Sequence, residues 1–186
     1  MWFLDRRGLL TGAAALLGAD IVAPLARALA AEATPGFTPS RAFFSAEQRS
    51  LAAAVSERIV PTTDTPGAIV AGVPAFMEMM LADSYEPTDR NEFMQGLGVT
   101  DGYARVHYGK PFAALTAQQQ DAVLTLAMDN KISGLPANFF QHLRQLVVLG
   151  YYSSEVGCKQ ERVYLPVPGR YDGKYPFADV RRVFSS

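Results

Sequence analysis

The stretch T-A-Q-Q-Q-D-A-V-L-T-L-A-M, Thr116 to Met128, decides the fold class of this chain of 186 residues. It opens with a capping box, in which the Thr116 hydroxyl can accept a hydrogen bond from the Gln119 backbone N–H while the Gln119 side chain reaches back. Apolar residues then recur at the spacing of one helix face. They are Val123, Leu124, Ala127 and Met128. The stretch therefore predicts an amphipathic helix that ends before Gly134.

The same capping-box form occurs in Ser45-Ala46-Glu47-Gln48 and predicts an earlier helix. The apolar positions of this helix again share one face. They are Leu51, Ala52, Val55 and Ile59. Pro61 must stop the helix, because proline lacks a backbone donor and clashes with the preceding turn. The next residues, P-T-T-D-T-P-G-A from Pro61 to Ala68, are typical of a loop with turn chemistry.

Three further helices are expected. A short one follows the loop, with Pro74 near its first turn. The next is capped by Thr88, and its glycines predict a kink or break between Gly98 and Gly102. The last opens near Pro136 and runs to Gly150, and its broad apolar face predicts that it is the central helix. Because no series of alternating strands occurs, residues 44–152 are expected to form an all-α bundle of about five helices.

The C-terminal segment, residues 153–186, is expected to be long and irregular, because prolines interrupt it and tyrosines lie between them. Tyrosine provides a large contact area at low entropy cost, and proline reduces what must be ordered on binding. We therefore predict that the segment binds a partner protein in an extended form. The predicted partner-binding residues are Tyr164, Pro166, Pro168, Tyr171 and Tyr175. The sequence leaves open the alternative that the segment folds back over its own helices.

The first residues, 1–30, have the three parts of an export signal. A charged head contains Arg6 and Arg7, an apolar stretch runs from Leu9 to Ala19, and small residues follow in an A-x-A arrangement up to Ala30. The apolar stretch is about half of the roughly 20 residues that a membrane-spanning helix needs, so no stable span is expected. The paired arginines resemble the twin-arginine signal for export of folded proteins to the periplasm. The alternative is that they are the positive head of an ordinary secretory signal.

Composition narrows the remaining possibilities. Residues 31–43 contain two prolines and a glycine and are expected to be a linker, which leaves enough chain for one domain. The formal net charge of the whole chain is −1 at pH 7 and no dense basic run occurs, so nucleic acid is not expected as a partner. Cys158 is the only cysteine, so an internal disulfide cannot form.

Motifs for chemistry are largely missing from the sequence. His107 and His142 are the only histidines, and they do not have the spacing of a metal or haem site. No glycine-rich phosphate loop or nucleophile elbow occurs. Asp64 and Glu155 lie in loops beside glycine and are the carboxylates that could act as an acid or base, although hydrogen bonding to the backbone explains them more simply. We therefore predict no catalytic, cofactor-binding or metal-binding residue in this chain.

Four stretches together resemble the gluconate 2-dehydrogenase subunit 3 family. They are R-I-V-P-T-T-D-T-P-G-A, A-G-V-P-A-F-M, G-Y-Y-S-S-E-V-G and Y-L-P-V-P-G-R-Y-D-G. The resemblance runs from about Phe44 to Pro176, and its most specific parts are Pro61 to Ala68 and Gly150 to Gly157. No family motif assigns catalytic residues, so none is carried over.

The resemblance implies a role as a small, non-catalytic subunit. Members of that family accompany a large flavoprotein of the glucose–methanol–choline type, which carries FAD, oxidises a sugar, sugar acid or glycoside, and commonly passes electrons to a cytochrome c. The small subunit would supply the export signal for a partner that lacks one and would escort it as a folded holo-protein. A free-standing periplasmic enzyme using Asp64 or Glu155, and a solute-binding module, are the alternative readings.

Overall fold

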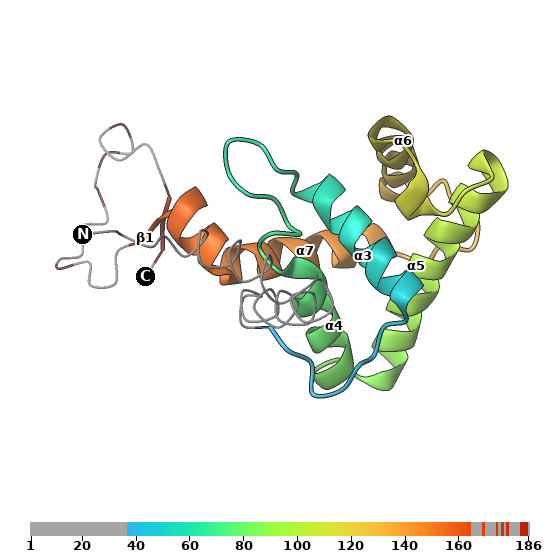
Figure 1. The fold of residues 1–186 in the computed structure, drawn as a ribbon, viewed down its shortest axis with the longest axis horizontal. Coiled ribbons are helices and arrows are strands. Elements are labelled where there is room, and N and C mark those ends of the chain that lie inside the picture. Colours follow the sequence, from blue (N-terminus) through green and yellow to red (C-terminus); the bar gives the residue numbers. More distant parts are fainter. Residues whose placement is uncertain are drawn as a thin grey trace, which may run out of the picture. The chain divides into compact units, whose positions relative to one another are not determined.

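A computed structural model of the chain describes residues 37–164, 169, 174, 176, 178 and 183–185. Within these residues the protein is all-α, as predicted, and Figure 1 shows the arrangement of its helices. The α-helices are α3 (Ala46–Ile59), α4 (Val73–Asp83), α5 (Pro87–Tyr108), α6 (Ala117–Met128) and α7 (Phe139–Ser153). Shorter elements are the 3₁₀ turn η1 (Phe112–Ala114), the π-helical turn η2 (Gly157–Glu161), and the strands β1 (Val163–Tyr164) and β2 (Phe184–Ser185).

Both predicted capping boxes are present. The Ser45 hydroxyl accepts from the Gln48 backbone N–H at 3.2 Å, and the Ser45 N–H donates to the Gln48 side chain at 2.8 Å. Thr116 and Gln119 make the same reciprocal pair at 3.4 and 3.1 Å. Each box satisfies backbone N–H groups that a helix start otherwise leaves unpaired. The starts of α3 and α6 are therefore fixed locally by the sequence.

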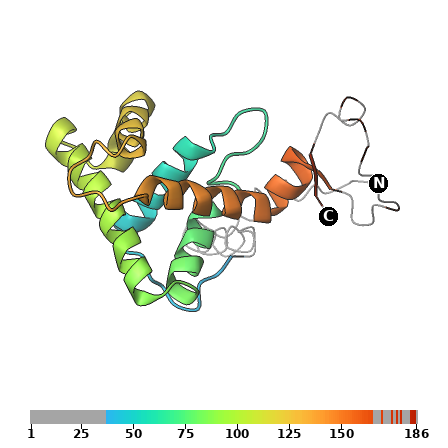
Figure 2. The same ribbon diagram turned by 180° about the vertical axis from the view of Figure 1, so that it is seen from behind.

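Helix α7 is the central helix, as its apolar face predicted. It packs against α3, α4, α5 and α6, and Figure 2 shows it running across the face that α3, α4 and α5 present. Leu143 and Val147 on its inner face are fully buried, and Tyr151 near its C-terminal end is nearly so. The hydrophobic core is thus built against the buried face of one helix that contacts the other four.

The expected break in the third helix was wrong, because α5 is continuous from Pro87 to Tyr108. Thr88 does not cap it: the N-cap is Glu86, and Pro87 occupies the first turn, where its missing N–H costs nothing. Gly96 serves close packing, since a Cβ there would lie 2.1 Å from the Phe139 ring of α7. The helix ends where Gly109 adopts a left-handed φ of 68°.

Two other boundaries differ from the sequence-based expectation. Helix α7 begins at Phe139 and not near Pro136, because Asn138 takes a left-handed φ of 61° and separates the preceding turn from the helix. The segment after residue 153 is not wholly irregular: Gly157–Glu161 forms the π-helical turn, and β1 pairs in parallel with β2. Residues Arg6, Arg7, Pro166, Pro168, Tyr171 and Tyr175 lie outside the described residues.

Candidate functional site

An ordered loop joins α3 to α4, and residues 61–72 are called the Glu57 loop here because one carboxylate organises them (Figure 1). Glu57 lies in the last turn of α3. One of its oxygens accepts from the Thr62 backbone N–H at 2.9 Å and from the Thr62 hydroxyl at 2.7 Å. The other accepts from the Ile69 backbone N–H at 3.0 Å. Both ends of the loop are therefore tied to a single side chain of a rigid helix.

Gly67 allows the loop to close on itself. Its backbone N–H donates to the Thr62 hydroxyl at 3.0 Å, which extends the network that starts at Glu57. A Cβ at this position would lie 2.5 Å from both the Thr62 backbone nitrogen and a Glu57 carboxylate oxygen. No side chain fits there without moving the backbone or the carboxylate, so glycine is required by close approach.

The loop is also hydrogen-bonded to two elements that come much later in the sequence. The Tyr151 hydroxyl donates to the Pro66 carbonyl at 2.9 Å, and the Thr65 hydroxyl donates to a Glu161 oxygen at 2.9 Å. Tyr151 belongs to α7 and Glu161 to η2. The two stretches that were most specific in the sequence, Pro61 to Ala68 and Gly150 to Gly157, are thus in direct contact.

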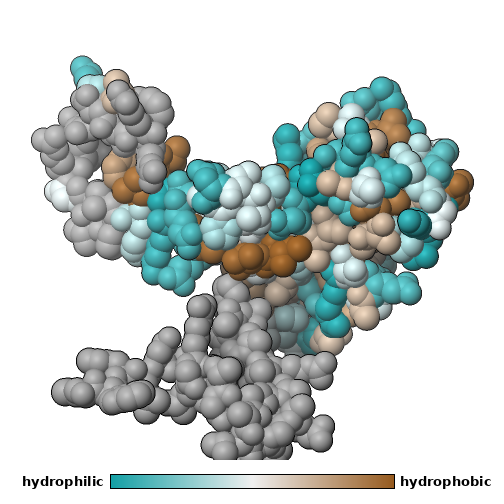
Figure 3. All heavy atoms as spheres, turned by 45° about the horizontal axis from the view of Figure 1, so that its top comes forward, coloured by the Kyte–Doolittle hydropathy of each residue, from teal (hydrophilic) through white to brown (hydrophobic). Residues whose placement is uncertain are grey.

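The last part of the Glu57 loop points apolar side chains outward. Ala68 and Ala71 are fully buried beneath it, whereas Ile69 is 50% exposed and Val70 is 57% exposed. Gly72 then takes a left-handed φ of 77° and starts α4. Apolar surface gathers in patches on the face of the molecule that Figure 3 shows. Two adjacent β-branched residues on an ordered turn are a feature that the core itself does not require.

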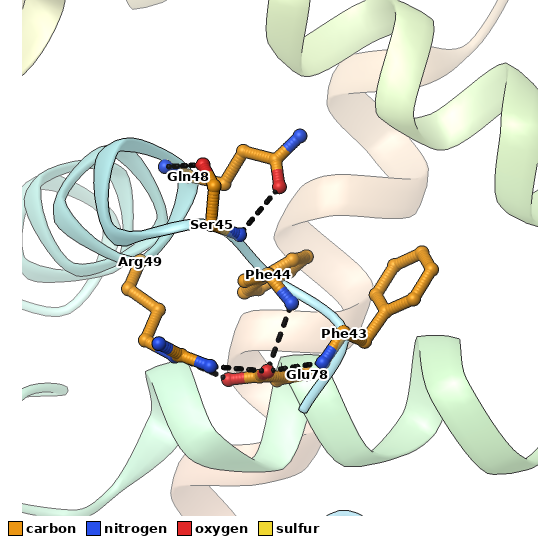
Figure 4. Close-up of polar contacts among 6 residues, drawn as sticks. All are labelled: Phe43, Phe44, Ser45, Gln48, Arg49 and Glu78. Atoms are coloured by element: carbon orange, nitrogen blue, oxygen red, sulfur yellow. Dashed lines mark hydrogen bonds and ion pairs between the residues drawn. The ribbon is translucent and has the colours of Figure 1, made fainter. Parts of the chain in front are cut away.

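Glu78 is a nearly buried carboxylate on α4, and Figure 4 shows its partners. It accepts from the backbone N–H groups of Phe43 and Phe44 at 2.7 and 2.8 Å, and from Arg49 at 2.9 and 3.0 Å. Burial opposes the charged form, but the hydrogen bonds from Arg49, Phe44 and Phe43 and the Arg49 charge outweigh it and lower the pKa of Glu78. This carboxylate joins the segment that precedes α3 to helix α4. Because four donors hold it in the ionised form, it is poorly suited to proton transfer.

The two carboxylates considered as acid or base have local partners. Asp64 accepts from the Thr63 hydroxyl at 2.9 Å, within the Glu57 loop. Glu155 forms an exposed ion pair with Lys159 one helical turn away, at 2.8 Å. The hydrogen bond and charge of Lys159 lower the pKa of Glu155, which favours its ionised form. Neither carboxylate lines the cavity beside Tyr85 and His142 or the cavity beside Leu51 and Met94.

The histidines lie apart in the fold. His107 stacks on Tyr103 in α5, with ring centroids 4.0 Å apart. His142 lines an open cavity of about 290 Å³ with Tyr85, Asp89 and Glu92. Within the described part of the chain, no group of three His, Cys, Asp or Glu side chains could hold a metal ion. Likewise, no helix that the structure describes is long and apolar enough to cross a membrane.

Two further residues singled out in the sequence lie near the end of the described chain. The Cys158 thiol, partly buried in η2, donates to the Tyr152 carbonyl at 3.0 Å. Tyr164, in β1, is 46% exposed, and the nearby strand β2 contributes the exposed Phe184. Of the predicted partner-binding residues, Tyr164 is the one that falls within the described residues.

Sequence reasoning missed Glu57, Glu78, Tyr151 and the outward pair Ile69 and Val70. For Glu78 a signal was available, because a single acid inside the apolar run F-M-E-M-M must find partners when that face is buried. The Glu57 contacts carried no such signal, since they depend on where the loop returns.

The fold and this surface are those of a small all-α protein with an ordered, partly apolar surface loop. Its family follows from comparison with known proteins. The chain belongs to the gluconate 2-dehydrogenase subunit 3 family, whose sequence profile matches residues 46–169. It is therefore an accessory subunit of a dehydrogenase complex. No curated protein and no solved structure gave a significant match.

Proposed function

We propose that this chain is the non-catalytic small subunit of a periplasmic dehydrogenase complex that oxidises a sugar, sugar acid or glycoside. FAD belongs to the large partner, a flavoprotein of the glucose–methanol–choline type. The small subunit stabilises the flavoprotein and escorts it through export in the folded state.

The observation that supports this proposal is the Glu57 loop on a chain of this family. The loop is held by side chains from α3, α7 and η2, and it presents apolar residues to solvent instead of enclosing a site. The carboxylates that an independent enzyme would use are engaged elsewhere, Glu155 in an exposed ion pair with Lys159 and Asp64 with Thr63. This arrangement favours binding another protein over chemistry on a small molecule.

The export part of the proposal rests on Arg6 and Arg7. A flavoprotein that is loaded with FAD in the cytoplasm must cross the membrane folded, and a partner with a twin-arginine signal can carry it. Residues 1–30 have the composition of such a signal.

One experiment tests both parts. The full chain with a C-terminal affinity tag is co-expressed with the flavoprotein subunit of its own organism, and periplasm and cytoplasm are fractionated. We expect the tagged chain to bring down a flavin-absorbing partner from the periplasm, and the double variant Arg6→Lys/Arg7→Lys to strand both proteins in the cytoplasm. The tagged chain expressed alone is the control and should be colourless.

Three results would contradict the proposal. Absence of flavoprotein from the purified wild-type complex would refute the subunit role. Stoichiometric flavin absorption in the chain expressed alone would refute its non-catalytic assignment. Undiminished periplasmic flavoprotein in the double arginine variant would show that the partner travels by its own signal.

A further inference from the structure

We propose that the Glu57 loop is the surface by which this subunit docks on the large subunit, with Ile69 and Val70 as the apolar anchors that enter a recess of that partner. This inference rests on the proposed function, since the partner is the flavoprotein named there. It adds which residues of this chain make the contact and what chemistry the opposing surface must have.

The anchors are exposed for no reason internal to the fold. The turn that contains them is fixed by Ala68 and Ala71, which are fully buried, and by backbone hydrogen bonds from Ala71 to Gly67 and from Val73 to Ala68. Positions 69 and 70 face outward and could be polar, as turn positions usually are. Instead two adjacent β-branched side chains remain about half exposed, which is the kind of apolar contact that association can bury.

The loop is organised before it meets a partner. Glu57 ties its two ends, Gly67 closes it on Thr62, and Tyr151 fixes its middle through Pro66. A surface segment that is already ordered loses little conformational entropy on binding, so more of the contact energy appears as affinity.

Charge indicates what the partner presents around the anchors. Glu57 and Glu161 flank the loop, and among the described residues each is held by neutral donors and not by an ion pair. Arg58, the residue next to Glu57 in the sequence, is engaged by Asp121 in a two-point contact at 2.7 Å. Apolar anchors with the Glu57 carboxylate beside them, and a second carboxylate, Glu161, elsewhere on the loop, are complementary to an apolar recess bordered by lysine or arginine. We therefore assign a basic-rimmed apolar recess to the large subunit.

The test is affinity of the purified small subunit for the purified flavoprotein, with the FAD absorbance identifying the partner. Ile69→Asp and Val70→Asp place a charge in the proposed recess and should each weaken binding by about 100-fold, the range of a strong interface residue. Ile69→Val keeps the contact and should stay within about fivefold of wild type. Raising the salt concentration should slow association with the wild type, because charges at an interface rim act mainly on the encounter rate.

The matched control is Val106→Asp, since Val106 is 81% exposed on α5 and lies outside the loop. It should bind like wild type, and the thermal midpoints of all free variants should be unchanged, because these side chains contribute little to the core. Wild-type affinity in both Ile69→Asp and Val70→Asp would overturn the inference. So would equal loss of binding in Val106→Asp, because that would indicate a nonspecific effect of added charge.

Failure of this inference is distinguishable from failure of the proposed function. If the wild-type subunit does not bind the flavoprotein at all, the proposed function fails. If the wild type binds and Tyr164→Ala abolishes binding while both loop variants retain it, the function stands and the docking surface lies at β1 instead.

Discussion

Replacing Glu78 with alanine should strongly destabilise the domain, because this carboxylate satisfies four donors at once. The variant leaves the Phe43 and Phe44 N–H groups and the Arg49 guanidinium without their acceptor. Breaking a buried ion pair by removing one partner commonly costs about 3–5 kcal/mol. The Arg49 side chain is 49% exposed and can be rehydrated. We therefore expect a loss of about 2–4 kcal/mol in the free energy of unfolding.

The measurement is chemical unfolding at neutral pH, with thermal unfolding as a second assay. For a domain of this size, each kcal/mol corresponds to about 2–4 °C in the thermal midpoint, so a drop of about 5–15 °C is expected. Glu155→Ala is the matched control, since it removes another carboxylate that pairs with a cation but lies on the surface. It should leave the midpoint unchanged within error. A Glu78→Ala domain within about 0.5 kcal/mol of wild type would refute the reasoning.

The same contact has a defined pH dependence. Because the pKa of Glu78 is lowered in the folded protein, its contribution is fully present above the ordinary value of 4.5 and is lost as the pH falls through the lower folded value. Acid should therefore remove a component of stability from wild type that Glu78→Gln lacks. Parallel stability curves for the two proteins between neutral pH and pH 3 would contradict this assignment.

Two further predictions follow from the packing of the helices and the loop. Gly96→Ala should cost about 1–3 kcal/mol, because its Cβ would lie 2.1 Å from the Phe139 ring, whereas Gly98→Ala, with open space around it in the same helix, should stabilise by about 0.5–1 kcal/mol. Equal effects of the two substitutions in chemical unfolding would argue against close packing of α5 on α7. Tyr151→Phe removes the hydrogen bond to Pro66 and should cost about 0.5–1.5 kcal/mol, with faster amide hydrogen exchange at Gly67 than in wild type. Unchanged exchange there would show that Tyr151 does not restrain the loop.

Local signals in the sequence correctly predicted where helices start. The features that were not predicted depend on contacts between residues that are distant in the sequence. Ser45 and Thr116 cap their helices through residues three positions away, so both starts could be read directly. The glycines of α5 were expected to interrupt the helix, but Gly96 is explained by the Phe139 ring, which lies more than forty positions later and on another helix. In a packed helix interface, that proximity outweighs the low helix propensity of glycine.

The candidate site was predictable only in part for the same reason. The sequence singled out the stretches Pro61 to Ala68 and Gly150 to Gly157 separately, but the bond between Tyr151 and Pro66 that joins them is a product of the fold. Asp64 and Glu155 were the candidate acid or base in the sequence because they lie in loops beside glycines. The carboxylate that organises the loop is instead Glu57, which lies inside a regular helix.

The position of α7 at the centre of the bundle has a consequence for how the protein is made. Synthesis proceeds from the N-terminus, and domains generally acquire their structure as the chain emerges. Here α3 to α6 are produced first, but the helix that all of them contact is the last of the five. A nascent chain that stops before Phe139 would expose their apolar faces together. The core can therefore close only late in translation, and incomplete chains should be recognised by chaperones and proteases and not persist as partly folded species.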